Sequence, residues 1–269
     1  MSESPVLTRE PAARDVEEDE QLQKVAEMLA NQPPMNTGSR LRIGMIMPSV
    51  NYVADPQIQT MLPENIQLHT TRIKLVGQSE EDLQKMLDEL DNCASLLADA
   101  RPQRILFHCT AASMLSPEMG GEICKQITDL TGIPATDTAD AVISAFETLG
   151  AKKIVLVSPY HPSVNEHEIE FFSHFGIEVL KDHALGLEGS QFGEVKPIEW
   201  YKVVLENRHP DADAYFISCA GARATEVISS MEEALGKPVV TSNSAVTWRC
   251  LRQSGVNDRI TEYGQLFSH

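Results

Sequence analysis

An internal repeat constrains the fold of this chain more than any other feature of its sequence. Three pairs of segments recur in the same order and at similar spacing: Pro48–Asn51 with Pro162–Asn165, Arg104–Cys109 with Ala214–Cys219, and Gly132–Pro134 with Gly236–Pro238. Members of the second pair both read as an apolar strand that ends in cysteine and is followed by small residues. Because one matching tetrapeptide can arise by chance but three ordered matches rarely do, the repeat predicts two similar lobes related by a pseudo-twofold axis.

Short apolar runs alternate with stretches of helical periodicity from residue 41 onward. The predicted strands are 42–47, 66–73, 104–108, 133–136, 153–158, 177–181, 214–218 and 238–242. The predicted helices are 80–98, 119–130, 140–149, 165–175, 197–206, 223–235 and 244–253. Alternation of this kind requires parallel sheets with right-handed crossovers. The sequence therefore predicts an α/β fold in which each lobe is a parallel sheet flanked by helices.

The domain organisation follows from the repeat and from the acidic start of the chain. We expect an N-terminal extension at 1–40, a first lobe at 41–150 and a second lobe at 151–269, with the C-terminal segment either staying there or packing back on the first lobe. A short helix is predicted at 16–30, before the Pro-Pro break. This extension is interpreted as a solvated tail or as a docking arm for a sister subunit.

Composition excludes several classes of partner. Lys and Arg total 22 against 39 Asp and Glu, a formal net charge of −17, which argues against binding to nucleic acid or to an anionic membrane. No run of 18 apolar residues and no secretory signal is present. The five cysteines form no C-x-x-C motif and have no zinc-ligand spacing with histidines. We therefore expect a cytoplasmic protein with reduced thiols, no metal site and no membrane contact.

Four polar side chains follow the predicted strands at equivalent places in the two lobes: Asn51, Cys109, Asn165 and Cys219. Ligands of parallel sheets gather at these carboxyl ends, so a pseudo-twofold axis would bring one Asn and one Cys from each lobe to a common cleft. Both cysteines precede a predicted helix, whose N-terminus lowers a thiol pKa and offers N–H groups to a carboxylate. Two facing thiols suit proton transfer at carbon, or one nucleophile paired with one acid.

The segments after each cysteine provide further candidate contacts. Thr110 and Ala111 open a segment with hydroxyl donors, and Ala220 and Gly221 let the backbone approach a ligand closely. Simpler interpretations stay open: the cysteines as small buried hydrophobes, the asparagines and Thr110 as helix caps, and Tyr160 as a packing residue. Core positions are expected for the remaining cysteines and for the histidine before the first candidate thiol: Cys93, Cys124, Cys250 and His108.

The chain resembles the aspartate/glutamate racemase superfamily, and within it the branch of maleate cis–trans isomerase and arylmalonate decarboxylase. Residues that carry the resemblance are Pro48–Asn51, Cys109–Ser113, Tyr160 with Asn165-Glu166, and Ser218-Cys219. The similarity extends from about Leu41 to Gln265. It implies an isomerase that needs no cofactor, acts beside a carboxylate of a small acid and assembles as a homo-oligomer, a dimer or a tetramer.

Residue roles follow from this resemblance. Cys109 would be the nucleophile and Cys219 the proton donor, while Asn51 and Asn165 hold carboxylates and Tyr160 donates a hydrogen bond to one of them. Three alternatives remain: a malonate decarboxylase that needs only Cys219, a racemase of an amino acid derived from ectoine, and a non-catalytic dicarboxylate-binding protein. The presence of both thiols favours the isomerase or racemase.

Overall fold

The computed structural model describes residues 16–31, 36–77 and 79–269, and divides the chain into two units, Met1–Asn36 and Thr37–His269. The first unit contains helix α1 (Val16–Ala30), as predicted. The large apolar side chains between residues 21 and 30 of this helix are exposed, Leu22 and Leu29 among them. Residues 1–15 and the proline-containing break at 32–35 lie outside the described residues, so the two interpretations of the extension stay open.

The second unit contains two four-stranded parallel sheets, which confirms the predicted fold class. The first sheet has the order β2-β1-β3-β4 and the second the order β6-β5-β7-β8. The strands are β1 (Leu41–Pro48), β2 (Ile66–Ile73), β3 (Arg104–Phe107), β4 (Ala135–Asp137), β5 (Lys153–Ser158), β6 (Glu178–Ala184), β7 (Ala214–Ile217) and β8 (Val239–Thr241). Equal strand orders are the structural counterpart of the sequence repeat.

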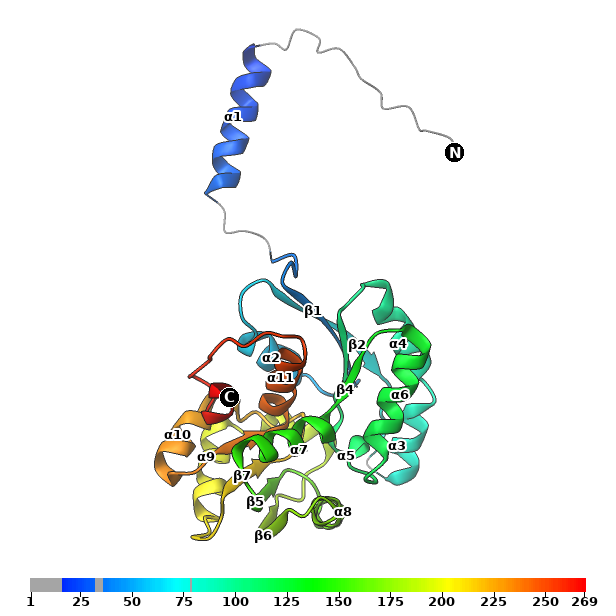
Figure 1. Ribbon diagram of the computed structural model, residues 1–269, viewed down its shortest axis with the longest axis vertical. Coiled ribbons are helices and arrows are strands. Elements are labelled where there is room, and N and C mark those ends of the chain that lie inside the picture. Colours follow the sequence, from blue (N-terminus) through cyan, green and yellow to red (C-terminus); the bar gives the residue numbers. More distant parts are fainter. Residues whose placement is uncertain (1–15, 32–35, 78) are drawn as a thin grey trace. The chain divides into compact units, whose positions relative to one another are not determined.

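Helices connect these strands in the manner expected for parallel sheets (Figure 1). They are α2 (Ala54–Met61), α3 (Glu80–Leu87), α4 (Leu90–Asp99), α5 (Thr110–Ser113), α6 (Met119–Thr131), α7 (Thr138–Leu149), α8 (Pro162–His174), α9 (Pro197–Glu206), α10 (Ile228–Leu235) and α11 (Ser242–Gln253). Short 3₁₀-helices are η1 (Gly189–Glu194), η2 (Thr225–Val227) and η3 (Gln265–Ser268). None of the described helices is long and apolar enough to span a bilayer.

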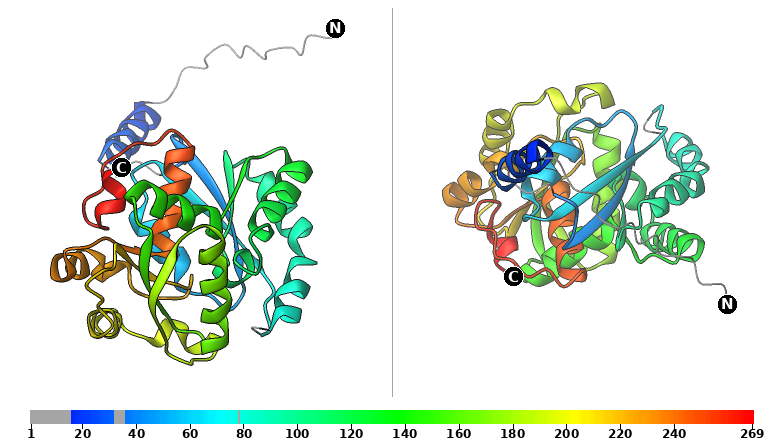
Figure 2. Two further views of the ribbon diagram at one scale, coloured as in Figure 1. Left: turned by 60° about the horizontal axis from the view of Figure 1, so that its bottom comes forward. Right: turned by 90° about the horizontal axis from the view of Figure 1, so that it is seen from above.

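Three apolar cores hold the sheets and helices together. Helices α3, α4 and α6 are grouped on one face of the first sheet and enclose a core with Phe107 and Leu97 (Figure 2). Helices α9 and α10 enclose a second core on the other sheet, around Trp200 and Tyr215. The third and largest core combines residues of both sheets, for example Met45 of β1 and Phe216 of β7. The two lobes are therefore packed into one unit through a shared interior.

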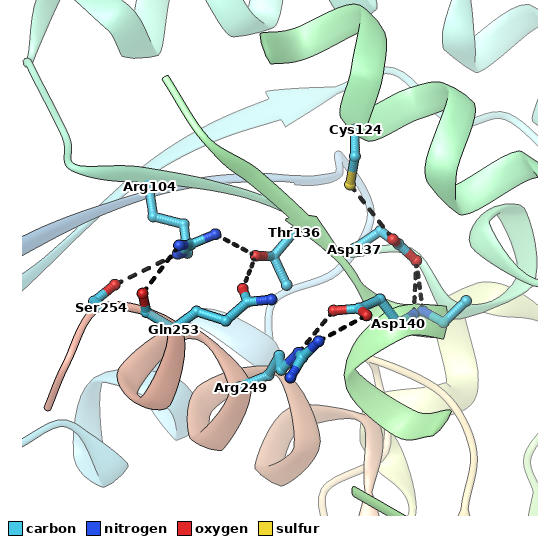
Figure 3. A network of polar contacts seen from close by, with 9 residues as sticks. Arg104, Cys124, Thr136, Asp137, Asp140, Arg249, Gln253 and Ser254 are labelled. Carbon is cyan, nitrogen blue, oxygen red and sulfur yellow. Dashed lines mark hydrogen bonds and ion pairs between the residues drawn. The ribbon is translucent and has the colours of Figure 1, made fainter. Parts of the chain in front are cut away.

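The C-terminal helix α11 follows the second sheet but packs on α2 and α7 of the first lobe. Figure 3 shows the polar contacts of this packing. Arg249 of α11 bonds both oxygens of Asp140 in α7, at 2.8 and 3.0 Å. Arg104 at the start of β3 donates to Thr136 and to the Gln253 carbonyl at the end of α11. The last helix thus ties the two repeats to each other.

Two predicted helices differ from the observed ones. The helix expected at 80–98 is divided into α3 and α4 by a turn at Asp88 and Glu89, neither of which breaks helical periodicity in the sequence. The helix expected at 223–235 begins as the 3₁₀ turn η2 and becomes α-helical at Ile228. In addition, α2 and the four-residue α5 were not predicted, because segments this short leave little periodicity to read.

Candidate active site

A cavity of about 230 Å³ lies beyond the carboxyl ends of β1, β3, β5 and β7. All of the predicted site residues except Asn165 line it: Asn51, Cys109, Thr110, Ala111, Tyr160, Cys219, Ala220 and Gly221. The topology explains this convergence, since parallel strands deliver the residues that follow them to the same edge of a sheet. Both cysteines therefore face one cavity, one from each repeat.

Cys109 lies between β3 and α5 with extended backbone, at a φ of −142°. Its side chain is buried, and burial raises the pKa of the thiol to about 11, although the backbone N–H of Ala112 donates to the sulfur and lowers it. The net shift is upward, opposite to the lowering that we predicted from the helix N-terminus. Helix α5 has four residues and offers few aligned peptide dipoles, so desolvation dominates.

Cys219 occupies a different backbone conformation, with a φ of +111°. The chain turns sharply there, the N–H of Gly221 donates to the sulfur at 3.2 Å, and no α-helix begins before Ile228. A helix follows Cys219, as predicted, but its α-helical part begins at Ile228 and not at residue 223. Burial raises the pKa of its thiol to about 12, against the lowering effect of hydrogen bonds from the Tyr160 hydroxyl and from Gly221.

Ser242, the first residue of α11, connects the two cysteine segments. Its hydroxyl oxygen accepts from the backbone N–H of Cys219 at 3.1 Å and from the Thr110 hydroxyl at 3.0 Å. Ser242 is not among the site residues predicted from the sequence. The repeat contained a usable signal, because Ser242 occupies the same place after Gly236 as Thr138 does after Gly132, and both open a helix at the end of a sheet.

The two asparagines do not occupy equivalent positions. Asn51 lines the cavity, and its Oδ1 also accepts from the N–H groups of Val53 and Ala54 at the start of α2. Both interpretations of this residue, helix cap and site residue, thus fit its position. Asn165 is fully buried outside the cavity lining, where its amide contacts Ser158 and Asp182. These contacts leave Asn165 without the access to a ligand that its role as a carboxylate-holding residue requires.

Tyr160 is buried in the cavity wall and packs edge-to-face on Phe192, with ring centroids 5.4 Å apart. Burial, followed by the proximity of Cys219 and Glu168, raises the pKa of its hydroxyl well above the ordinary value of 10. The tyrosine is therefore a neutral donor at physiological pH. Its ring rests on η1, so packing and a site role coexist in this residue.

Two further residues of the cavity were overlooked in the sequence. Glu168 of α8 lines it from a fully buried position. Tyr52 lies at its edge, and its hydroxyl donates to Glu194 of η1 at 3.0 Å, so that the segments after β1 and before α9 meet there. Glu168 follows Asn165 by one helical turn, which was the available signal. An exposed aromatic such as Tyr52 gives no comparable signal.

The rest of the lining is mainly apolar: Val50, Val53, Leu75, Leu83, Met114, Leu115, Val164 and Phe192. No lysine or arginine is among the described residues that form it. A bound carboxylate would therefore be held by neutral donors, namely backbone N–H groups, hydroxyls and amides. Across residues 16–31, 36–77 and 79–269, no cluster of His, Cys, Asp and Glu has the arrangement of a metal site.

Comparison with known proteins agrees with this geometry. Maleate isomerase of Geobacillus stearothermophilus is 29% identical over 243 residues, which cover 84% of this chain and 97% of that protein. The crystal structure of a Cys-to-Ala variant of maleate isomerase from Pseudomonas putida S16 with maleate superposes with a TM-score of 0.81 at 26% identity, covering 85% of this chain and 97% of that one.

A second solved structure shares the fold at lower identity. It is a Cys-to-Ser variant of Nocardia farcinica maleate cis–trans isomerase with a covalently bound succinylcysteine intermediate, and it superposes with a TM-score of 0.80 at 21% identity over 84% of this chain and 98% of that one. Residues 43–267 match the sequence model of the family described as arylmalonate decarboxylase. Since this match spans most of the chain, the protein belongs to the arylmalonate decarboxylase family.

Proposed function

We propose that this protein is a cysteine-dependent maleate cis–trans isomerase that needs no cofactor. The observation that carries the proposal is the pair of thiols, Cys109 and Cys219, that face one small cavity from equivalent places in the two repeats. Relatives that are maleate isomerases support the choice of substrate. A binding protein would have no need for two buried thiols, whereas addition to a double bond and its reversal need a nucleophile and an acid.

The reaction consists of an addition, a rotation and an elimination. Cys109 enters as the thiolate and forms a bond from sulfur to one alkene carbon, while Cys219 gives its proton to the neighbouring carbon. The former double bond is now single and rotates. Cys219, left as a thiolate, takes a proton back from that carbon, and the bond between carbon and the sulfur of Cys109 breaks to give the trans isomer. Both side chains return to their starting forms.

The thiol pKa values decide how much enzyme is active. The active pair carries one proton, yet burial raises the pKa of Cys109 to about 11 and that of Cys219 to about 12. The singly deprotonated pair is therefore a minor form near pH 7. Hydrogen bonds stabilise each thiolate when it forms. Ala112 donates to Cys109, which is the thiolate before addition, and Gly221 and Tyr160 donate to Cys219, which is the thiolate after it.

The test is incubation of the protein with maleate in deuterium oxide, followed by proton NMR. We expect fumarate to form, with deuterium entering the alkene carbon. Cys109→Ala and Cys219→Ala should each abolish turnover, and iodoacetamide should inactivate the wild type. Cys124→Ala is the matched control, because Cys124 lies on α6 against Asp137 and away from the cavity lining. Turnover that survives both active-site substitutions would refute the proposal.

Decarboxylation of a malonate with an apolar substituent is the second candidate. The apolar side chains of the cavity favour it, because Leu83, Met114 and Phe192 offer an aromatic or alkyl group a place to bind. That reaction needs Cys219 alone as proton donor. Release of carbon dioxide from phenylmalonate, retained in Cys109→Ala, would select this function over isomerisation.

The assembly and location of the protein belong to the same proposal: a homo-oligomer, dimer or tetramer, in the cytoplasm. All five cysteines are free, which suits a reducing compartment. The exposed apolar face of α1 is a candidate contact with a sister subunit. Light scattering after size-exclusion chromatography, on the full chain and on a chain without residues 1–36, measures the assembly and the contribution of α1.

A further inference from the structure

Glu168 is a buried carboxyl group for which the isomerisation steps give no role. Its side chain is 1% exposed, it projects from α8, and it belongs to the cavity lining. The Ser218 hydroxyl donates to Oε1 at 2.7 Å, whereas Oε2 is buried and has no hydrogen-bond partner. A buried polar atom without a partner is rare in a folded protein, so its presence in a cavity indicates a ligand that completes it.

The surroundings of Glu168 determine its charge. Tyr160, from the loop before α8, and Cys219, from the turn after β7, are the titratable groups that face it, and His167 is its neighbour in the lining. No cationic lysine or arginine side chain stands among the described lining residues. Burial raises the pKa of the carboxyl to about 8, more than the Ser218 hydrogen bond lowers it. Glu168 is therefore a neutral carboxylic acid at pH 7.

The hydrogen-bond pattern places the acidic proton. Because Ser218 donates to Oε1, that oxygen acts as the carbonyl acceptor, and the proton of the neutral acid resides on Oε2. This O–H has no partner within the protein, and Glu168 belongs to the cavity lining close to Tyr160 and Cys219. An acid kept neutral by a low-polarity site is an effective hydrogen-bond donor to an anion.

We propose that Glu168 binds the substrate as a neutral acid, donating a hydrogen bond from Oε2 to a carboxylate of the dicarboxylate. This inference rests on the proposed function and assigns Glu168 as a substrate-binding residue on the side of Cys219. It also explains how an acidic glutamate can line a site for an anion. Ionisation of Glu168 removes the donor and places a negative charge against the ligand, so binding and ionisation exclude each other.

The experiment measures the affinity of succinate by isothermal titration calorimetry between pH 6 and pH 9.5. Succinate is a dicarboxylate without a double bond, so no addition occurs during the titration. In the wild type we expect constant affinity below pH 8 and a fall of about tenfold per pH unit above it, as linkage to one proton requires. Glu168→Gln keeps a neutral donor in the same place and should bind with the same affinity throughout this range.

Two further variants distinguish Glu168 from its neighbours. Glu166→Gln makes the same chemical change at an exposed position of α8 and should retain the wild-type pH dependence. Ser218→Ala removes the hydrogen bond that lowers the pKa of Glu168, so the fall in affinity should move to higher pH.

The outcomes separate this inference from the function on which it rests. Two results would overturn the role of Glu168 but leave the isomerase function standing, provided that maleate is turned over. In one, the wild type binds succinate with an affinity that does not depend on pH. In the other, Glu168→Gln shows the same fall in succinate affinity as the wild type. Loss of both maleate turnover and succinate binding in the wild type would remove the isomerase function and this inference with it. One further result would overturn the role of Glu168 as a neutral acid. Diaminobutyrate would bind more tightly as the pH rises in the wild type but not in Glu168→Gln, because an ammonium ligand needs the ionised form of Glu168.

Discussion

Replacing Glu168 with Gln should change how the stability of the protein depends on pH. In the folded protein burial raises the pKa of this carboxyl from the ordinary 4.5 to about 8. Between these values the folded protein keeps a proton that the unfolded chain has already released. Stability therefore falls as the pH rises from 4.5 to 8 and then stays level with respect to this group.

The size of the effect follows from the shift in pKa. Each pH unit in this window contributes about 1.4 kcal/mol, so the shift of roughly 3.5 units costs the wild type about 5 kcal/mol at pH 8 relative to pH 4.5. Glutamine does not titrate, and its amide can still accept from Ser218. We therefore compare the unfolding free energy of Glu168→Gln with that of the wild type at two pH values. The advantage of the variant should be larger at pH 8 than at pH 5.

Urea unfolding of both proteins, followed by circular dichroism at half-unit steps from pH 4.5 to 9, measures this difference. Other groups with a shifted pKa, such as Asp137 and Glu232, titrate equally in both proteins and cancel when the two curves are subtracted. Parallel curves across the whole range would show that Glu168 is ionised in the folded protein. The account of a neutral acid in the cavity would then be wrong.

Three other changes test separate parts of the structure. Ser242→Ala leaves the buried N–H of Cys219 without its acceptor; we expect a loss of about 1–3 kcal/mol in urea unfolding and a larger fall in kcat than rise in KM. Burial lowers the pKa of His108 from 6.5 to about 4, so the folded protein keeps this residue neutral while the unfolded chain takes up a proton. Between pH 6.5 and 4 the wild type should therefore lose about 3 kcal/mol of stability relative to His108→Gln, measured as the difference between the two urea-unfolding curves. Gly193→Ala places a Cβ 2.6 Å from the Tyr52 ring and should cost about 1–3 kcal/mol, a cost that shrinks in a Tyr52→Ala background.

Much of this fold could be predicted because its sequence repeats. The pattern around Cys109 and Cys219 indicated two parallel sheets and one shared cleft, and the strand orders of the sheets are equal. Periodicity failed where the tertiary structure overrides it. The turn at Asp88 and Glu89 has no glycine or proline to mark it, and the packing of α4 on α6 and β2 decides where the helix divides.

The site was predictable in its location but not in its electrostatics. Sequence position placed both thiols near helix starts, which favoured a lowered pKa, yet the depth of burial raised it instead. Burial depends on the whole packed unit and leaves no local trace in the sequence. Glu168 could not be recognised for the same reason. Its spacing from Asn165 can be read from the sequence, but the lack of cationic side chains around it is a property of the assembled cavity.

The backbone at Cys219 shows what covalent linkage of the two repeats permits. A symmetric dimer of identical halves must give both thiols the same conformation, since one gene encodes both. Here one thiol lies on extended backbone at a φ of −142° and the other at +111°, a left-handed conformation that is costly for a residue with a Cβ. Fusion into a single chain lets each half accumulate its own substitutions. The two repeats can therefore hold their thiols in different conformations while the two sheets keep equivalent strand orders.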